Sequence, residues 1–196
     1  VREQSERDYQ LASGLSQDVE TDDNVFRQTT ARLPWLIIGM LGGIGNSMIL
    51  GNFDATFAAH PEMALYIPLI GGTGGNVGTQ SSALIVQGLA NSSLDSKNTL
   101  KQVAKEAVVA LINATIISLL VYTYNFIRFG AMATVTYSVS ISLFAVVMFA
   151  SIFGTLVPMT LERLKIDPAI ATGPFIAITN DIIGMMLYMG ITVLLS

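Results

Sequence analysis

The sequence predicts an all-α integral membrane protein with five transmembrane helices, preceded by a cytoplasmic amphipathic or connecting helix. Hydrophobic residues make up 52% of the 196 residues and charged residues only 12%, whereas a typical soluble domain carries about 25% charged residues. The mean hydropathy is +0.58. Charged residues are concentrated in residues 1–33, so a polar segment precedes a strongly apolar one.

The polar segment, residues 1–33, has weak helical spacing of its apolar residues. We interpret it as one or two packed surface helices with a loop near residues 16–23, and a disordered linker is the alternative. The first apolar run starts only at Leu33, so no signal-peptide pattern is visible. The predicted division is a cytoplasmic connecting region, 1–33, and a five-helix transmembrane domain, 34–196.

Five apolar segments are long enough to cross a bilayer, which takes about 20 residues at 1.5 Å rise each. They are residues 34–52, 63–89, 107–127, 134–161 and 168–195. Pro34 is placed as a helix-start residue, and Gly39 and Gly43 have the spacing of closely packed membrane helices. Gly173-Pro174 should bend or open the last helix near its inner end.

The positions of Lys and Arg predict the orientation, because these residues are enriched in cytoplasmic loops. With a cytoplasmic N-terminus, nine of the ten lie inside and only Arg128 lies outside. We therefore expect a multi-pass protein of the cell (inner) membrane with an extracytoplasmic C-terminus. Lys97, Lys101 and Lys105 would form an exposed face beside the lipid headgroups. No basic patch indicates nucleic acid as a partner.

A glycine-rich stretch interrupts the apolar pattern of segment 63–89. Five glycines lie between Gly71 and Gly78, with the polar residues Asn76, Thr79 and Gln80 among or just after them. A lipid-facing helix gains nothing from this composition. The stretch is typical of a helix that packs closely against its neighbours, or of one that opens its backbone onto a water-filled path. The pattern leaves both interpretations open.

Asp181 lies near the middle of the last predicted span. A charged carboxylate at that depth costs about 2.5–3.5 kcal/mol on insertion scales, so such residues usually face a cavity or the interior of a bundle. The functional interpretation is a cation or proton site. The structural alternative is a protonated Asp181 that hydrogen-bonds to a neighbouring helix.

The side chains available near Asp181 favour a hard cation. The chain has no cysteine and a single histidine, so the candidate ligands are oxygen atoms. They belong to the glycine-stretch carbonyls and to Asp181, Asn76, Asn180, Thr79 and Thr179. Such a set suits Mg²⁺, Ca²⁺, Mn²⁺ or an alkali ion, and this chemistry does not exclude Na⁺ or H⁺. Asp167 before Pro168 is predicted to cap the start of the last span.

These residues give the chain a resemblance to the membrane domain of the MgtE family of magnesium transporters. It rests on Pro34-Trp35, on Gly-Gly-Asn76-Val-Gly-Thr-Gln80, and on Asp167-Pro-Ala-Ile-Ala-Thr-Gly-Pro174 with Asp181 and Gly184. The match runs from about Pro34 to the end. Residues 3–33 resemble, more loosely, the connecting or plug helix of the family. The family's N-terminal and CBS domains, which sense intracellular Mg²⁺, have no counterpart in these 196 residues.

The resemblance implies a homodimer in lipid, with an ion path along its two-fold interface that carries hydrated Mg²⁺ into the cytoplasm. Mg²⁺ would be both the transported and the bound ion, and no enzymatic chemistry is expected. The resemblance places the central carboxylate on Asp181 and the asparagine of the second span on Asn76. It places backbone carbonyl ligands on Ala177 and Gly72, with Thr79 nearby, and the acid at the inner mouth on Asp167.

The sequence pattern is compatible with other functions. A transporter of Mn²⁺ or Co²⁺, or a carrier coupled to Na⁺ or H⁺, would use the same kind of ligands. A non-transporting membrane scaffold subunit is an alternative of another class, although a scaffold does not need a buried acid at mid-span. An intramembrane hydrolase is disfavoured, because the sequence shows no Ser/His or paired-acid arrangement at a suitable depth.

Overall fold

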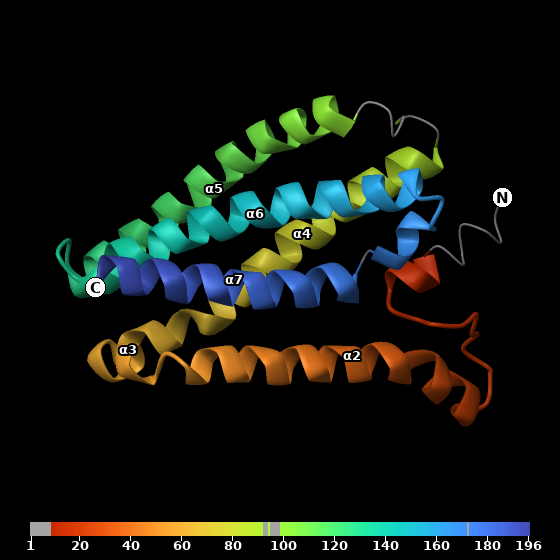
Figure 1. The fold of residues 1–196 in the computed structure, drawn as a ribbon, viewed down its shortest axis with the longest axis horizontal. Helices are drawn as coiled ribbons and strands as arrows, with labels where there is room; N and C mark the ends of the chain where they lie inside the picture. The colour runs from red at the N-terminus through yellow and green to blue at the C-terminus, as the bar shows by residue number, and fades with distance from the viewer. Residues whose placement is uncertain (1–8, 92–93, 95–98, 172) are drawn as a thin grey trace.

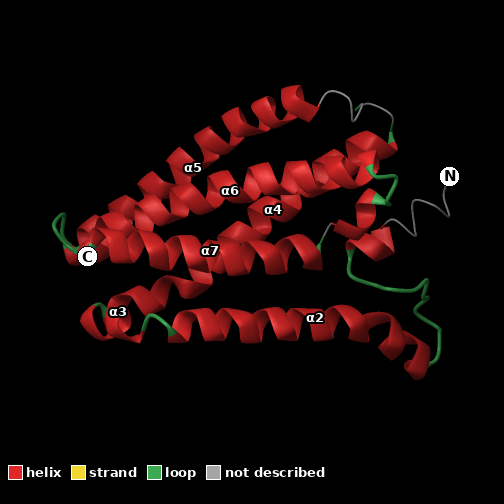
Figure 2. Ribbon diagram, viewed as in Figure 1, coloured by secondary structure: helices red, strands yellow, loops and turns green. Residues whose placement is uncertain are grey.

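The computed structural model describes residues 9–91, 94, 99–171 and 173–196, and within them every regular element is helical (Figures 1 and 2). A short helical stretch at residues 9–12 comes first. The later elements are α2 (Val25–Gly51), α3 (Asp54–Ala59), the 3-10 helix η1 (Pro61–Tyr66), α4 (Ile67–Ala90), α5 (Thr99–Phe129), α6 (Thr134–Arg163), the 3-10 helix η3 (Pro168–Ala171) and α7 (Pro174–Leu195).

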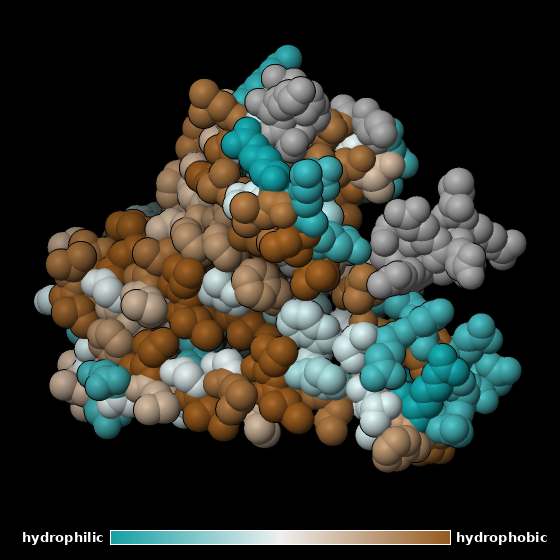
Figure 3. Space-filling model, turned by 45° about the vertical axis from the view of Figure 1, so that its right-hand side comes forward, coloured by the Kyte–Doolittle hydropathy of each residue, from teal (hydrophilic) through white to brown (hydrophobic). Residues whose placement is uncertain are grey.

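Four of these helices, α2, α5, α6 and α7, are long and apolar enough to cross a membrane. Helix α4 has 24 residues but is not among them, since glycines and polar residues interrupt its apolar run. Large apolar side chains are exposed along α2 and α5, and apolar residues cover most of the face in Figure 3. The prediction of an all-α membrane protein is therefore confirmed. That α4 also crosses the membrane, which would bring the spans to five, stays a prediction.

Helix α6 is the central element of the bundle. It packs against α4, α5 and α7, and its serine and threonine side chains are largely buried. Ser138 Oγ donates a hydrogen bond to Thr192 Oγ1 of α7 at 3.1 Å, while Ser140 Oγ donates to a carbonyl of its own helix. Small side chains of this kind let membrane helices approach closely and can hydrogen-bond between them.

The start of α2 differs from the prediction. The helix begins at Val25, so Pro34 lies inside it and not at its first position. The cause is Asn24, whose Oδ1 accepts a hydrogen bond from the Arg27 backbone N–H at 2.8 Å and caps the helix. One continuous helix therefore crosses the predicted boundary between residues 33 and 34.

Helix α5 also begins earlier than predicted, at Thr99 instead of Ala107. Lys101 and Lys105 lie exposed on this extension, whereas Lys97 lies outside the described residues. The extension is polar, so a search for apolar runs does not detect it. Helix α5 therefore continues beyond the apolar segment that the hydropathy pattern defines.

Residues 13–24 form a loop, which includes the loop predicted near residues 16–23. Hydrogen bonds hold it to neighbouring segments. The Gln10 side chain donates to the Val19 carbonyl at 2.9 Å and accepts from the Val19 N–H at 3.1 Å. The backbone N–H and the hydroxyl of Ser16 both donate to the Ala31 carbonyl at 2.9 Å. These bonds favour a packed segment over a disordered linker for residues 9–24.

The same segment contacts the start of α7. A β-carbon at Gly14 would lie 2.6 Å from Pro174 Cγ, and one at Gly173 would lie 2.1 Å from the Ala12 carbonyl oxygen. Both glycines have a positive φ, +83° and +57°, which other residues adopt at a cost. The helical structure is interrupted here, between the end of η3 and the start of α7, so the interruption predicted at Gly173-Pro174 is confirmed.

Gly42 sets the separation of α2 and α7, and we expect Gly42→Val to push them apart. A β-carbon at Gly42 would lie 2.4 Å from Ile178 Cγ2, and the β-branched Ile178 has little rotamer freedom to yield. The unfolding free energy should fall by about 1–3 kcal/mol, as in other overpacked sites. Thermal unfolding in detergent measures this, with Gly43→Val as the control because nothing lies within 4 Å of that position. Equal melting temperatures would contradict the predicted contact.

Candidate functional site

The glycine-rich stretch of α4 forms part of a continuous α-helix, which favours close packing over an opened backbone. A β-carbon at Gly74 would lie 2.9 Å from Val146 Cγ1 of α6, and one at Gly78 would lie 1.9 Å from Asn180 Nδ2 of α7. A β-carbon at Gly154 of α6 would lie 2.4 Å from the Gly78 carbonyl oxygen. Glycines therefore let α4 fit between α6 and α7.

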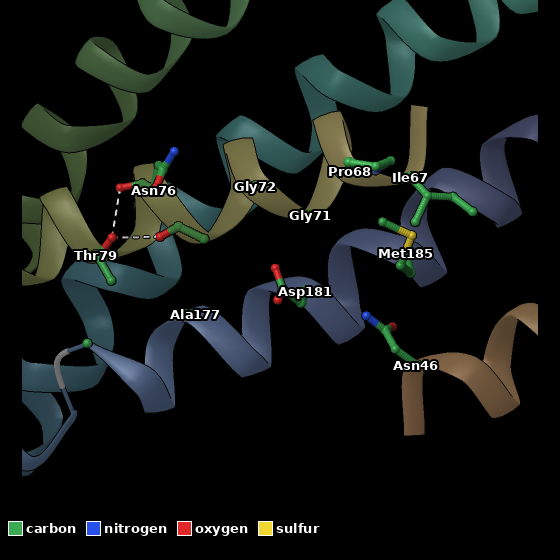
Figure 4. A pocket seen from close by; sticks show the side chains of 12 residues that line it. Asn46, Ile67, Pro68, Gly71, Gly72, Asn76, Thr79, Ala177, Asp181 and Met185 are labelled. Atoms are coloured by element: carbon green, nitrogen blue, oxygen red, sulfur yellow. Dashed lines mark hydrogen bonds between the residues drawn. The ribbon is translucent and has the colours of Figure 1, made fainter. Parts of the chain in front are cut away.

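Asp181 is half-buried on α7 and its carboxylate points toward α4 (Figure 4). β-Carbons at Gly71 and Gly75 would lie 3.3 Å and 3.6 Å from Asp181 Oδ1. These glycines are one helical turn apart, so together they form a shallow recess that leaves room for the carboxylate. No hydrogen bond to Asp181 is found within the part of the chain that the structure describes. The structural alternative of a bond to a neighbouring helix therefore has no partner there.

A cavity of about 470 Å³ opens beside Asp181, between α2, α4 and α7 (Figure 4). It is lined by Asn46, Ile67, Pro68, Gly71, Gly72, Gly75, Asn76, Thr79, Gly173, Ala177, Asp181 and Met185. Five of the six residues predicted for the metal site are among them, namely Asp181, Asn76, Ala177, Gly72 and Thr79. The structure thus brings together residues that lie about a hundred positions apart in the sequence.

The polar groups of α4 approach this cavity in different ways. Thr79 Oγ1 donates to the Gly75 carbonyl at 2.7 Å and lies 3.0 Å from the Asn76 carbonyl. Its oxygen lone pairs remain available to accept hydrogen bonds from water. Asn76 is exposed, and its side chain points away from Asp181 (Figure 4). Asn76 and Asp181 therefore line one cavity without facing each other within a single chain.

Three other candidates lie outside the lining. Asp167 is exposed, and its Oδ1 accepts from the Ala169 N–H at 2.9 Å, so it caps η3 and not α7 itself. Asn180 is 1% exposed and its amide lies against Gly78, on another side of α7 from Asp181. Successive helical residues point about 100° apart, which separates these two neighbours in space. Thr179 is not part of the lining.

Asn46 and Met185 are among the lining residues that were not predicted from the sequence. Met185 lies one turn after Asp181 on α7, where an apolar residue in an apolar run gives no signal. Asn46 comes from α2, one turn after Gly42. A glycine one turn away is a signal of a packed face, but α2 carries glycines on more than one face, so the sequence alone does not single out Asn46.

The arrangement suits an ion that keeps most of its water. No group of three or more His, Cys, Asp or Glu side chains that could hold a metal occurs among the described residues. Gly72 and Ala177 lie within continuous helices, where backbone carbonyls commonly accept an intrahelical bond. The carbonyl oxygens of Gly72 and Ala177 would offer their second lone pair more readily to a water molecule than to a bare cation. Mg²⁺ loses water reluctantly and is often held through few carboxylates.

Comparison with known proteins supports the same grouping of helices. A family model described as a divalent cation transporter, MgtE, matches residues 67–191, which is more than half of the chain. The chain belongs to the MgtE family. The matched residues begin with α4 and extend into α7, so both the glycine-rich helix and Asp181 lie within the part that defines the family.

Three relatives bear the name Magnesium transporter MgtE. That of Bacillus subtilis (strain 168) is 30% identical over 191 residues, which are 97% of this chain and 42% of the relative. That of Thermus thermophilus is 34% identical over 165 residues, 84% of this chain and 36% of the relative. That of Enterococcus faecalis is 26% identical over 197 residues, 97% of this chain and 42% of the relative. This chain therefore spans about two fifths of the length of the relatives it matches.

Proposed function

We propose that this chain forms the membrane pore of a magnesium channel or transporter, which moves hydrated Mg²⁺ across the cell membrane into the cytoplasm. The observation that carries the proposal is the cavity in which Asp181 lies beside the glycine face of α4, with Asn76 and Thr79 on the same helix. The names of the three relatives point to the same ion. Binding and passage of an ion need no enzymatic step.

The proposed pathway runs along the two-fold axis of a homodimer, between α4 and α7 of each copy. Asp181 supplies the charge, while Asn76, Thr79 and the carbonyls of Gly72 and Ala177 hold the water shell. The direction of the Asn76 side chain, away from Asp181 of the same chain, supports a site that a second copy completes. Asp167 would attract the ion at the inner mouth.

In the proposed topology α4 also crosses the membrane, as the second of five spans, the N-terminus is cytoplasmic and the C-terminus is extracytoplasmic. Residues 1–33 then form the connecting region on the cytoplasmic side of the pore domain, 34–196. An inside-negative potential contributes about 2.3 kcal/mol per elementary charge per 100 mV, and twice that for a divalent ion. Influx of Mg²⁺ therefore needs no coupled ion.

Mg²⁺ uptake into proteoliposomes that contain the full chain and a trapped fluorescent indicator tests the proposal. We expect uptake above that of empty vesicles, which grows with an inside-negative potential and persists without a Na⁺ or H⁺ gradient. Loss of uptake when such a gradient is removed would instead indicate a coupled carrier. Faster Mn²⁺ or Co²⁺ flux in competition would indicate another divalent substrate. No flux from correctly inserted protein would indicate a scaffold.

A further inference from the structure

We propose that Asn46 of α2 is a positioning residue for the ion beside Asp181, so that α2 forms a third wall of the pathway. The inference rests on the proposed function and deepens it. It adds a polar side chain from a helix that lies outside the α4–α7 pair. Its ligand is the water shell of a hydrated divalent cation.

The helix register places Asn46 at the level of Asp181. Helices α2 and α7 touch where Gly42 meets Ile178, and from there they run in the same direction (Figure 1). Asn46 lies one turn beyond Gly42, just as Asp181 lies about one turn beyond Ile178, and residues so spaced share a helix face. Both side chains accordingly line the same cavity.

The Asn46 amide is incompletely paired in this position. Its Oδ1 has less than 1 Å² of accessible surface and no hydrogen-bond partner in the described structure. Leaving such a group unpaired costs about 1–3 kcal/mol, and the membrane interior supplies no water to compensate. Because Oδ1 is closed off from the cavity, the amide nitrogen is the end of Asn46 that can reach it, where the water shell of a hydrated cation offers acceptors.

The other end of the amide faces the site. In Figure 4 the amide nitrogen of Asn46 points toward Asp181 and Met185. No hydrogen bond to the Asp181 carboxylate is found in the described part of the chain. Asn46 Nδ2–H therefore donates to that carboxylate through a cavity water and keeps it turned toward the ion. As a neutral group, Asn46 orients the charge of the site without adding to it.

The substitution Asn46→Leu distinguishes a positioning role of Asn46 from a role in packing alone. Leucine has the same branched skeleton of four side-chain heavy atoms as asparagine and suits an apolar helix contact, so with a role in packing alone Asn46→Leu would leave transport unchanged. If Asn46 positions the water shell, the same change removes the only donor that α2 contributes to the lining. Mg²⁺ depends on ordered outer waters more than the larger Ca²⁺ does, so discrimination between the two ions should also fall.

The experiment compares Mg²⁺ and Ca²⁺ uptake in proteoliposomes for the wild type, Asn46→Leu, Asn46→Gln and Asn113→Leu. Asn113 is exposed near the middle of α5, so Asn113→Leu is the same chemical change away from the cavity. We expect Asn46→Leu to raise the half-saturating Mg²⁺ concentration about 3- to 10-fold and to lower the Mg²⁺/Ca²⁺ uptake ratio. Asn46→Gln should recover part of both, and Asn113→Leu should match the wild type.

The outcomes separate the inference from the function on which it rests. Wild-type half-saturation and ion ratio in Asn46→Leu, measured beside a wild type that transports Mg²⁺, would overturn the role of Asn46 alone. An equal shift in Asn113→Leu would also overturn it. A wild type that carries no Mg²⁺ would overturn the proposed function itself. Should Asn46→Leu fail to insert, Asn46→Ser is judged by the same two quantities.

Discussion

Replacement of Asp181 by asparagine is expected to lower Mg²⁺ uptake in proteoliposomes by about ten- to hundredfold. The substitution keeps the shape of the side chain and removes its charge. Asp181 is the only acidic side chain among the residues that line the cavity, so no neighbour replaces it. Hydrogen bonds to a charged group are worth about 1.5–3 kcal/mol, and each 1.4 kcal/mol corresponds to about tenfold in binding.

The matched control is Asp54→Asn, the same change at an exposed acid at the start of α3. It should leave uptake within about twofold of the wild type, because exposed charges are well screened by salt. A comparable loss in Asp54→Asn would mean that Asp181 acts only through general surface attraction. Normal, selective uptake by an inserted Asp181→Asn variant would remove Asp181 from the site.

The sequence predicted the main helices because apolar length is a strong signal. It predicted the break at Gly173 because proline restricts the backbone there and glycine allows the positive φ that ends a helix. It failed at helix ends. Pro34 suggested a helix start, yet the Asn24 cap begins α2 earlier. The polar first turns of α5 carry no hydropathy signal. In α4 the helix is continuous, but glycines and polar residues lower its hydropathy, so its membrane span stays a prediction.

The candidate site was partly predictable for a different reason. A mid-span carboxylate is costly enough to identify Asp181 by itself. The choice between Asp181 and its neighbour Asn180 depends on the rotation of α7, which the sequence alone does not give. Asn46 depends further on which face of α2 meets α7, and only the contact of Gly42 with Ile178 establishes that. Positions set by the packing of two helices need the structure.

Substitution of Gly154 by alanine is expected to separate α6 from α4 and to impair both stability and uptake. The added β-carbon would lie 2.4 Å from the Gly78 carbonyl oxygen and 3.2 Å from the carbonyl carbon. Backbone atoms cannot rotate away as a flexible side chain can, so α4 itself must move. We expect the unfolding free energy to fall by about 1–3 kcal/mol.

The displacement should also reach the ion path, because Gly75 and Asn76 lie on the same helix within one turn of Gly78. Gly190→Ala is the matched control, since nothing lies within 4 Å of a β-carbon there and alanine favours a helix over glycine by about 1 kcal/mol. Thermal unfolding and Mg²⁺ uptake of the two variants form the measurement. If Gly154→Ala is as stable and as active as Gly190→Ala, α4 and α6 do not touch at Gly78. The glycines of α4 would then have to be explained by the ion path alone.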